Sequence, residues 1–352
     1  MNAALKRFAA ASVAESGAVS MPVDGRIALR IHAIREDGEG IRVFDLHAAN
    51  LAENAGASLP PWTPGAHLKL SLPNGLERCY SLCNVPGEDR FYRIAVKRES
   101  ATRGGSGWLH EQARVGMQLS SGAPQNAFPL QASEVPPVLF AAGIGITPIY
   151  AMAADLLHRG RSVQLHYFAR SLQHAAFLSA LMQPGMAPHC TLHLGLDAEA
   201  VAAALHKALA ALARNTPLYL CGPAPFIAQV RAQAESLGWE EADIHFELFA
   251  AAPFSAPTPD EPVSSVFELV LQKSGVRCQV QPGQSIVDAA AQAGVEIGTS
   301  CGEGFCGSCQ STVLEGVPEH RDSVLSSRER AAGNCILPCV SRCSSARLVL
   351  DL

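Results

Sequence analysis

The cysteines near the end of the chain constrain its fold more than any other sequence feature. Six of the eleven cysteines lie within residues 301–343, and Cys301, Cys306 and Cys309 are spaced as C-x4-C-x2-C. This spacing is typical of three ligands of a plant-type [2Fe–2S] cluster. Glycines in the loop allow the tight curvature and close backbone approach that thiolates around a cluster require. A structural zinc site usually pairs its cysteines as two separated C-x2-C knuckles, whereas this loop has one. The loop therefore predicts an iron–sulfur centre.

The fourth ligand must come from further along the chain, where Cys335, Cys339 and Cys343 are the candidates. This stretch resembles plant-type ferredoxin domains, in which the last ligand follows the third by about 29 residues, near a Cys-Val-Ser-Arg string. Cys339 opens such a string here. The resemblance therefore implies Cys339 as the fourth ligand and leaves Cys335 and Cys343 as spare thiols.

Composition excludes several other classes of protein. The 352 residues allow two or three domains, and 48% apolar with 17% charged residues is ordinary for a globular chain. A formal charge of −5 without a basic stripe argues against a nucleic-acid partner. The N-terminus lacks the sustained apolar core of a signal peptide, and the uncharged stretch 135–154 contains prolines and glycines that disfavour a membrane span. We expect a cytoplasmic monomer with neither a nucleic-acid nor a membrane partner.

The pattern of apolar residues changes twice along the chain. Short alternating runs separated by turn residues predict an antiparallel sheet or small barrel, with strands at 26–33, 41–47, 67–72 and 92–97. Buried apolar runs that alternate with helical patterns then predict a parallel α/β sheet. Four prolines close together predict a stiff linker before the cysteine-rich part. The expected division is a tail at 1–22, an antiparallel β-barrel domain at 23–131, an α/β domain at 132–251, the linker at 252–263 and an α+β (β-grasp) ferredoxin domain at 264–352.

A candidate flavin motif lies at the end of a strand in the first domain. In Arg78-Cys-Tyr80-Ser81 the tyrosine can stack on an isoalloxazine ring, the serine can bond near the flavin N5, and the arginine can clamp a phosphate. Four such residues also recur by chance at ordinary strand ends. A glycine turn with Gly105 and Ser106 opens a helix downstream, and its free amides suit an anionic phosphate.

A candidate nicotinamide motif follows a buried strand. Gly143-Ile-Gly145-Ile-Thr147-Pro148 opens a helix, and the glycines let the backbone approach a pyrophosphate. The motif is not G-x-G-x-x-G, because Pro148 occupies the third glycine position, so a ferredoxin-reductase type of nucleotide domain is favoured over a Rossmann dehydrogenase.

Together these motifs resemble the ferredoxin–NADP reductase superfamily, and their order resembles the phthalate dioxygenase reductase family, which includes the vanillate demethylase reductases. The resemblance covers about residues 23–352 and implies FMN rather than FAD. It places Arg78, Gly105 and Ser106 at the phosphate, and Tyr80, Ser81 and Lys97 at the flavin ring. It also places Cys221-Gly222-Pro223 beside the nicotinamide, where a small side chain lets C4 approach flavin N5. Ser81 and Cys221 are the candidate catalytic residues, although Cys221 could also be a buried strand-end thiol.

Two further positions have competing interpretations. Arg170 and Ser171 follow a strand and could contact the adenosine ribose; an arginine there could accept the 2′-phosphate of NADPH, whereas the resembled family prefers NADH. We expect NADH. Phe249 could cover the flavin or fill a domain boundary. His245 and Glu247 are given structural roles, because no general acid–base residue is required.

These expectations combine into an electron-transfer enzyme. We expect hydride transfer from NADH to FMN, then one-electron transfer through the [2Fe–2S] cluster to a Rieske-type aromatic-ring oxygenase or demethylase. The alternatives are a reductase for a cytochrome P450 or another one-electron acceptor, a redox-sensing iron–sulfur binding protein, and a zinc-stabilised interaction module.

Overall fold

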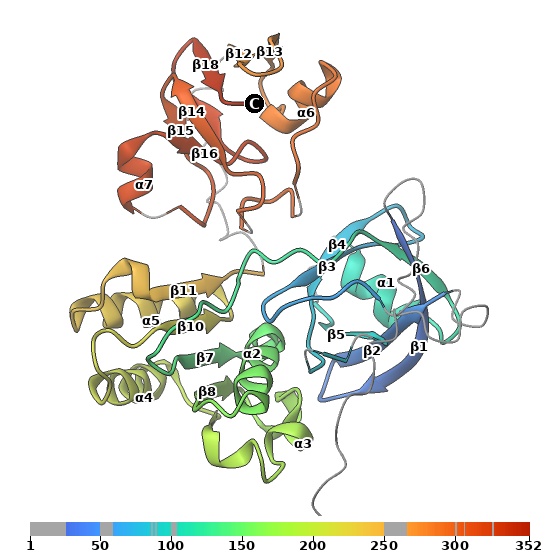
Figure 1. Cartoon of the computed structure of the whole chain (residues 1–352), viewed down its shortest axis with the longest axis vertical. Coiled ribbons are helices and arrows are strands. Elements are labelled where there is room, and N and C mark those ends of the chain that lie inside the picture. The colour runs from blue at the N-terminus through green and yellow to red at the C-terminus, as the bar shows by residue number, and fades with distance from the viewer. Residues whose placement is uncertain are drawn as a thin grey trace, which may run out of the picture.

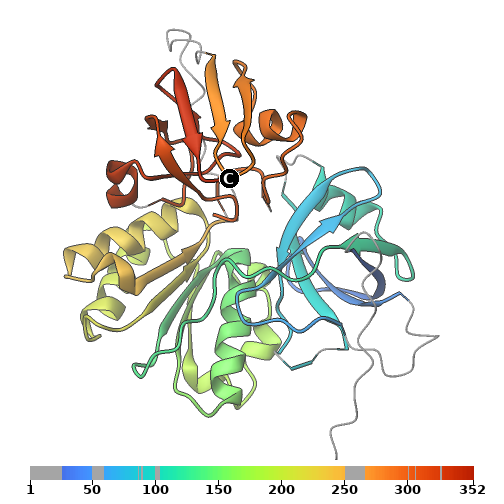
Figure 2. The same cartoon turned by 45° about the horizontal axis from the view of Figure 1, so that its top comes forward.

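The structure is a computed structural model. It describes residues 26–49, 59–85, 87–88, 90–99, 104–249, 266–299, 301–305, 307–325 and 327–352. The expected tail 1–22 and linker 252–263 lie outside the described residues. The described residues form three lobes, with the C-terminal lobe above the junction of the other two (Figures 1 and 2).

The first lobe is the expected antiparallel sheet, closed into a barrel. Its six strands run in the order β4-β3-β6-β1-β2-β5, and a bridge between Leu82 and Ile94 joins the two outer strands. Alternating apolar residues such as Phe44, Leu68 and Tyr92 fill its interior. The strands are β1 Ile27–Glu36, β2 Ile41–Ala48, β3 His67–Ser71, β4 Glu77–Ser81, β5 Tyr92–Lys97 and β6 Gln118–Ser121.

A short helix, α1 (Gly105–Glu111), covers part of the barrel. It begins after Gly104, whose φ of 88° lies in the left-handed region that glycine adopts without strain. The predicted glycine turn opening a helix is therefore present.

The second lobe is a parallel five-stranded sheet in the order β11-β10-β7-β8-β9. The chain leaves the central strand β7 in one direction and returns on its other side at β10, which makes the β7–β10 boundary a topological switch point. Helix α2 covers one face, while α4 and α5 cover the other. The main elements are β7 Val138–Ala142, α2 Ile146–His158, β8 Gln164–Ala169, β9 Cys190–Leu194, α4 Ala198–Ala210, β10 Leu218–Cys221, α5 Ala224–Ser236 and β11 Ile244–Glu247.

The third lobe is a mixed sheet in the order β13-β12-β18-β14-β16, with the helix α6 (Ile286–Gln292) in its core cluster. Its central pair β12–β18 is parallel, while the outer pairs are antiparallel. The β15 and β17 strands form a separate ribbon. The strands are β12 Phe267–Leu271, β13 Val276–Val280, β14 Ser311–Glu315, β15 Pro318–Glu319, β16 Cys335–Ile336, β17 Arg342–Cys343 and β18 Arg347–Leu350, and a helix α7 spans Ser327–Ala332.

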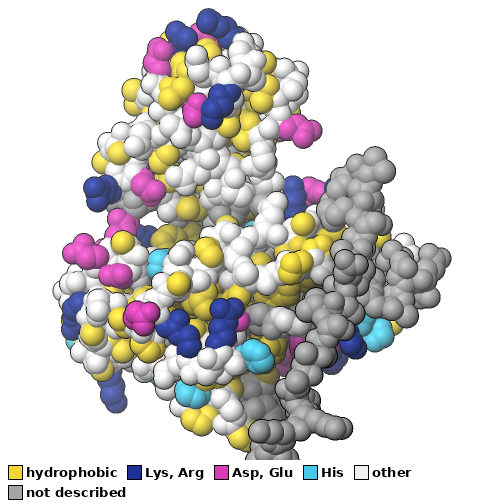
Figure 3. All heavy atoms as spheres, in the orientation of Figure 1, with side chains coloured by type: hydrophobic (Ala, Val, Ile, Leu, Met, Phe, Trp, Pro, Cys, Tyr) yellow, Lys and Arg dark blue, Asp and Glu magenta, His cyan; other side chains and the backbone are white. Residues whose placement is uncertain are grey.

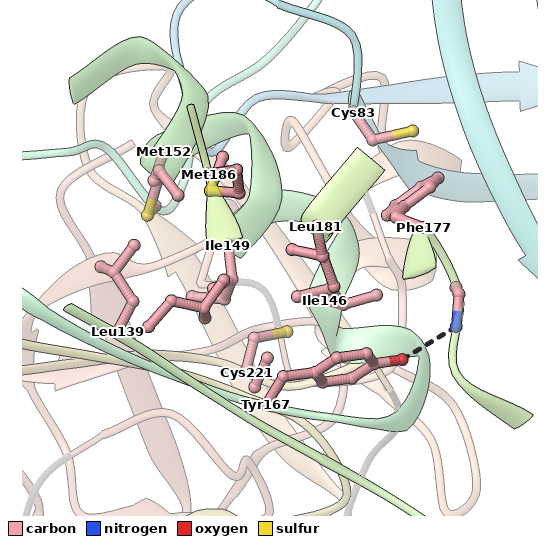
Figure 4. Packing of buried hydrophobic residues seen from close by; sticks show 14 of the residues in the cluster. Cys83, Leu139, Ile146, Ile149, Met152, Tyr167, Phe177, Leu181, Met186 and Cys221 are labelled. Carbon is pink, nitrogen blue, oxygen red and sulfur yellow. Dashed lines mark hydrogen bonds between the residues drawn. The ribbon is translucent and has the colours of Figure 1, made fainter. Parts of the chain in front are cut away.

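One apolar cluster joins the barrel to the nucleotide lobe. Ile41, Val43 and Cys83 of the barrel pack with Ile149 and Met152 of α2. Figure 4 shows Cys83 pointing toward side chains of the nucleotide lobe, and the Tyr167 hydroxyl accepting a hydrogen bond from the backbone of Ala176. This shared core fixes the barrel against the sheet.

Charges of both signs are interspersed over the face shown in Figure 3. Within the described part of the chain, no helix is both long enough and apolar enough to cross a bilayer.

The buried His166 and the half-buried His193 lie side by side on the sheet. Gln164 Nε2 lies 2.9 Å from His166 Nε2, and His166 Nδ1 lies 3.0 Å from His193 Nε2. Burial, and secondarily the charge of His193, lowers the pKa of His166 to about 4. An unfolded histidine titrates near 6.5, so only the unfolded chain takes up this proton as the pH falls toward 4. Above pH 6.5, His166 therefore makes its full contribution to the free energy of unfolding. This contribution, about 3 kcal/mol at most, is lost as the pH falls from 6.5 to about 4.

We predict that His166→Asn reduces the loss of unfolding free energy between pH 6.5 and pH 4, as measured by urea denaturation. His206→Asn, at an exposed position, is the matched control and should behave as the unmodified chain does. An unchanged pH profile in His166→Asn would contradict the assignment.

Candidate functional site

The flavin motif and the glycine turn lie together on the barrel. Arg78 of β4 crosses directly over Gly105, since a Cβ atom added to Gly105 would lie 2.6 Å from Arg78 Cγ. The Glu99 amide donates to Ser106 Oγ at 3.4 Å, and Glu99 pairs with Lys97 Nζ at 2.7 Å. A guanidinium, a hydroxyl and helix-start amides therefore share one region, which suits a phosphate group.

Tyr80 precedes Ser81 in β4 and is half-buried. Its ring packs against the barrel core, and burial raises the pKa of its hydroxyl. The phenol is therefore neutral, as a ring that stacks on a flavin would be.

The nicotinamide motif lies at the carboxyl ends of β7 and β10, at the switch point. A Cβ atom on Gly145 would lie 2.3 Å from the Cys221 carbonyl oxygen, and one on Gly222 would lie 2.9 Å from Ala142 Cβ. Gly143 has a φ of 55°. The two turns therefore interlock only with glycine at these positions. Thr147 is buried and its hydroxyl donates to the Ile144 carbonyl at 3.0 Å, which orders the same turn.

A carboxylate that the sequence pattern treats as structural lies between the two motifs. Ser81 Oγ donates toward Glu247 Oε2 at 3.5 Å, and Glu247 is paired with Cys221 across β10 and β11. Burial raises the pKa of Glu247 to about 8, an effect that the hydrogen bond from Ser81 partly offsets. Burial and the neighbouring Glu247 also keep the pKa of the Cys221 thiol well above its usual value. A serine, a thiol and a carboxyl whose pKa is raised by burial thus meet at the domain boundary.

The only sequence signal for Glu247 is its place at the carboxyl end of a strand beside the switch point. Glu247 lies close to Ser81, which is far away in the sequence, because the barrel packs against the nucleotide lobe. Pro223 is the N-cap residue of α5, directly after the turn that follows Cys221.

The loop with Arg170 and Ser171 follows β8 and is fixed to the barrel. Asp37 Oδ2 accepts a hydrogen bond from the Phe177 amide at 3.0 Å, and the Glu39 amide donates to the Gln173 carbonyl at 2.6 Å. In the described residues, Phe177 is the one non-glycine residue with a positive φ, 59°. Such a conformation persists where its surroundings hold it. The Arg170 side chain is exposed beside this clamped loop.

Phe249, the last described residue of the nucleotide lobe, is half-buried and packs against the core shared with the barrel. This position places Phe249 at the boundary between the barrel and the nucleotide lobe.

The cluster loop brings the described thiols together. Cys309 Sγ lies 3.3 Å from Cys339 Sγ, and the Glu303 amide donates to Cys301 Sγ at 3.3 Å. Hydrogen bonds with Cys301 and Cys309 raise the pKa of Cys339, while the bond with Cys339 lowers that of Cys309. Cys306 lies outside the described residues. Three thiols in contact, together with a backbone amide aimed at a sulfur, fit a [2Fe–2S] cluster.

The loop glycines have the conformations that the sequence predicts. Gly302, Gly304 and Gly307 have φ values of 67°, 73° and 73°, and a Cβ atom on Gly304 would lie 2.4 Å from Val340 Cγ2. Among the other candidate ligands, Cys343 Sγ lies 3.0 Å from Ser345 Oγ, in a separate set of bonds. Cys335 is buried in the domain core, which raises the pKa of its thiol.

Comparisons with known proteins agree with this arrangement. The 2Fe-2S iron-sulfur cluster binding domain family matches residues 269–344, and the N-terminal domain of dimethylamine monooxygenase subunit DmmA-like proteins matches residues 117–244. The phenoxybenzoate dioxygenase subunit beta of Ectopseudomonas oleovorans is 40% identical over 93% of this chain and 97% of its own. Vanillate O-demethylase oxidoreductase of Pseudomonas sp. (strain HR199 / DSM 7063) is 40% identical over 88% and 96%. The solved phthalate dioxygenase reductase is 33% identical, with a TM-score of 0.68, over 95% of this chain and 100% of its own.

The chain belongs to the phthalate dioxygenase reductase family. The resemblance inferred from the motifs and the expected fold class are both confirmed. As a member of this family the chain is an oxidoreductase, an electron-transfer reductase with a 2Fe–2S domain. An intact type IV self-sufficient cytochrome P450 monooxygenase also matches, at 29% identity and a TM-score of 0.76 over 93% of this chain and 41% of its own.

The raised pKa of Glu247 leads us to expect that the rate of this reductase depends on pH. A neutral carboxyl can donate a hydrogen bond, and ionisation removes that donor and holds the Ser81 hydroxyl on the carboxylate. We predict that the NADH-dependent reduction of an acceptor slows as the pH rises through about 8, and that Glu247→Gln abolishes this dependence. Steady-state rates between about pH 6 and pH 10, roughly two units on each side of the pKa, provide the measurement.

Glu240→Gln is the matched control, because Glu240 is exposed in the loop that precedes β11. It should keep the pH profile of the unmodified chain. If Glu247→Gln also keeps that profile, Glu247 does not cause the pH dependence of the rate.

Proposed function

We propose that this chain transfers electrons from NADH, through FMN on the barrel and a [2Fe–2S] cluster, to the oxygenase component of a Rieske-type aromatic-ring oxygenase or demethylase. The observation that carries the proposal is the convergence of three motifs at one junction. Ser81 of the flavin motif lies 3.5 Å from Glu247, beside Cys221 of the nicotinamide motif. On the same strand as Ser81, Cys79 lies near the cluster-loop thiol Cys301, whose charge adds to the burial that raises the pKa of Cys79 to about 12.

The residues of the chain then have distinct tasks. Arg78, Gly105 and Ser106 hold the flavin phosphate, while Tyr80, Ser81 and Lys97 face its ring. When bound, a flavin accepts a hydride and releases electrons singly, which a nicotinamide cannot do. Around it, the chain supplies placement and exclusion of water.

The nucleotide lobe presents the other reactant. Gly143, Gly145 and Thr147 form the pyrophosphate turn, Gly222 and Pro223 form the turn beside the nicotinamide, and Cys221 leaves room for close approach. Arg170 and Ser171 contact the adenosine ribose and Phe249 covers the flavin in this proposal. The proposal also includes the domain limits 23–131, 132–251 and 264–352. It further includes a monomeric state and a cytoplasmic location.

The choice of FMN and NADH rests on resemblance to the family. Chromatography of the flavin released on denaturation distinguishes FMN from FAD, and the ratio of kcat/KM for NADH and NADPH tests the nucleotide. If FAD is released, FAD takes the place of FMN in the proposal. If NADPH is preferred, it takes the place of NADH. The order of electron transfer stays the same in both cases.

The names of the relatives support an oxygenase partner, since two of them are a dioxygenase subunit and a demethylase oxidoreductase. A second candidate function, a reductase for a cytochrome P450, is supported by the match to the self-sufficient P450 monooxygenase. Reconstitution with a purified Rieske oxygenase or with a P450 separates the two, because only the true partner turns over its substrate with NADH.

We predict that Cys339→Ser removes the cluster absorbance from the visible spectrum while NADH still bleaches the flavin bands. Loss of a thiolate ligand prevents cluster assembly, whereas the flavin and nicotinamide motifs lie in other domains. Cys343→Ser is the matched control and should keep the cluster. Retained cluster absorbance in Cys339→Ser would shift the fourth ligand to Cys335 or Cys343, and a colourless protein with zinc would exclude the proposed function.

A further inference from the structure

The cluster loop is held from two sides. Lys69 Nζ, on the barrel strand β3, donates a hydrogen bond to the Thr299 carbonyl at 3.2 Å, two positions before Cys301. On the other side, Phe305 packs against the nucleotide-lobe cluster that contains Ile227 and Leu248. Figures 1 and 2 both show the ferredoxin domain above the junction of the barrel and the nucleotide lobe. The loop is thus anchored to both of its neighbours.

Lys69 is oriented toward the loop by its own strand neighbours. It pairs in register with Cys79 of β4, and its side chain shares a face with His67. Its Nζ also pairs with Glu77 at 2.8 Å. The hydrogen bond from Lys69 is the largest of the influences that lower the pKa of Glu77. Because Glu77 already restrains the lysine, less side-chain entropy is lost when the ferredoxin domain docks.

The rest of this junction is open and is lined by both polar and apolar residues. A cavity of about 500 Å³ lies between the two domains, and its lining includes His67, Gln125, Asn126, Thr299, Ser308 and Gln310. His67 Nε2 is buried without a hydrogen-bond partner among the described residues. The outline of the molecule also narrows where the upper lobe meets the lower ones (Figure 3). A cavity of this size interrupts the packing between the barrel and the ferredoxin domain, so the domain is not held there by a continuous packed interface.

Among the described residues, few apolar side chains pack between the barrel and the ferredoxin domain. The contact of Lys69 with Thr299 therefore contributes a large share of the free energy that docks the ferredoxin domain on the barrel. We propose that Lys69 is a positioning residue: it docks the cluster loop on the barrel and so sets the rate of electron transfer from the flavin site to the cluster. Phe305 is the opposing anchor. The inference rests on the proposed function. Each NADH supplies two electrons and one proton is released, so two one-electron acceptors are reduced for each NADH oxidised.

The test compares Lys69→Met with the full-length flavin- and cluster-loaded protein. Cytochrome c reduction serves as the cluster-dependent assay and ferricyanide reduction as the flavin-level assay, with Cys339→Ser used to verify which acceptor needs the cluster. A hydrogen bond to a charged group changes an equilibrium by about tenfold or more. We predict that Lys69→Met slows cytochrome c reduction about tenfold and leaves ferricyanide reduction unchanged.

A second readout is independent of turnover. Hydrogen–deuterium exchange should be faster in Lys69→Met at Thr299 and at residues 301–305, and Lys69→Arg, which keeps the donor and the charge, should restore both readouts. Lys273→Met is the matched control, because Lys273 pairs with Asp351 within the ferredoxin domain at 2.9 Å. It should match the unmodified protein in both measurements.

Unchanged cytochrome c reduction in Lys69→Met would overturn the proposal, whether or not exchange in the loop increases. An equal loss of both acceptor activities would also overturn it, because the variant would then act on the flavin site. If the unmodified protein fails to reduce cytochrome c through its cluster, the proposed function itself fails, and this outcome is distinct from the other two.

Discussion

The packing of the barrel against helix α2 is the interaction on which the site depends. Ile41, Val43 and Cys83 share one apolar core with Ile149 and Met152, and each buried aliphatic side chain of this kind contributes about 1.5–3 kcal/mol. A closed barrel and a parallel sheet are both rigid, so this seam fixes the end of β4 relative to the ends of β10 and β11. The 3.5 Å approach of Ser81 to Glu247 follows from it. Hydride transfer requires that kind of fixed, close placement of its reactants.

The ferredoxin domain is attached in a different way. On the barrel side its cluster loop meets a lysine and a cavity of about 500 Å³ instead of a continuous apolar seam. On the nucleotide side Phe305 packs against the core of the nucleotide lobe. Electron transfer between cofactors tolerates a looser junction than hydride transfer, because no atom has to be exchanged between them. The two interfaces therefore match the two kinds of step in the proposed sequence.

Features that depend on local sequence were predictable. The C-x4-C-x2-C loop and the glycine turns before α1 and α2 are each set by short-range backbone geometry, and the structure has them. The close approach of Gly145 and Gly222 to each other's turns joins distant parts of the chain and was not predicted. Long periodic elements such as α2 and α4 also follow the sequence pattern closely. Strand β9 has no clear signal, because an edge strand with half-buried residues lacks both a continuous apolar run and clean alternation. The short strands β14 to β18 are similarly set by pairing around the cluster loop.

Contacts between domains could not be predicted, since they join residues with no fixed spacing. Glu247 is the clearest case: its carboxyl is significant only because the barrel brings Ser81 to it, 166 positions away in the sequence. Lys69 is another, because nothing near it in the sequence indicates a bond to the ferredoxin domain.

The most direct test of the central claim is an anaerobic titration of the purified protein with NADH, followed by visible and EPR spectroscopy. A two-electron flavin and a one-electron cluster together take up three electrons, so the end point should lie at about 1.5 NADH per chain. The flavin bands should bleach, and the EPR signal of a reduced [2Fe–2S] cluster should develop in the same titration. An end point at about one NADH per chain with the cluster still oxidised would contradict the proposed path.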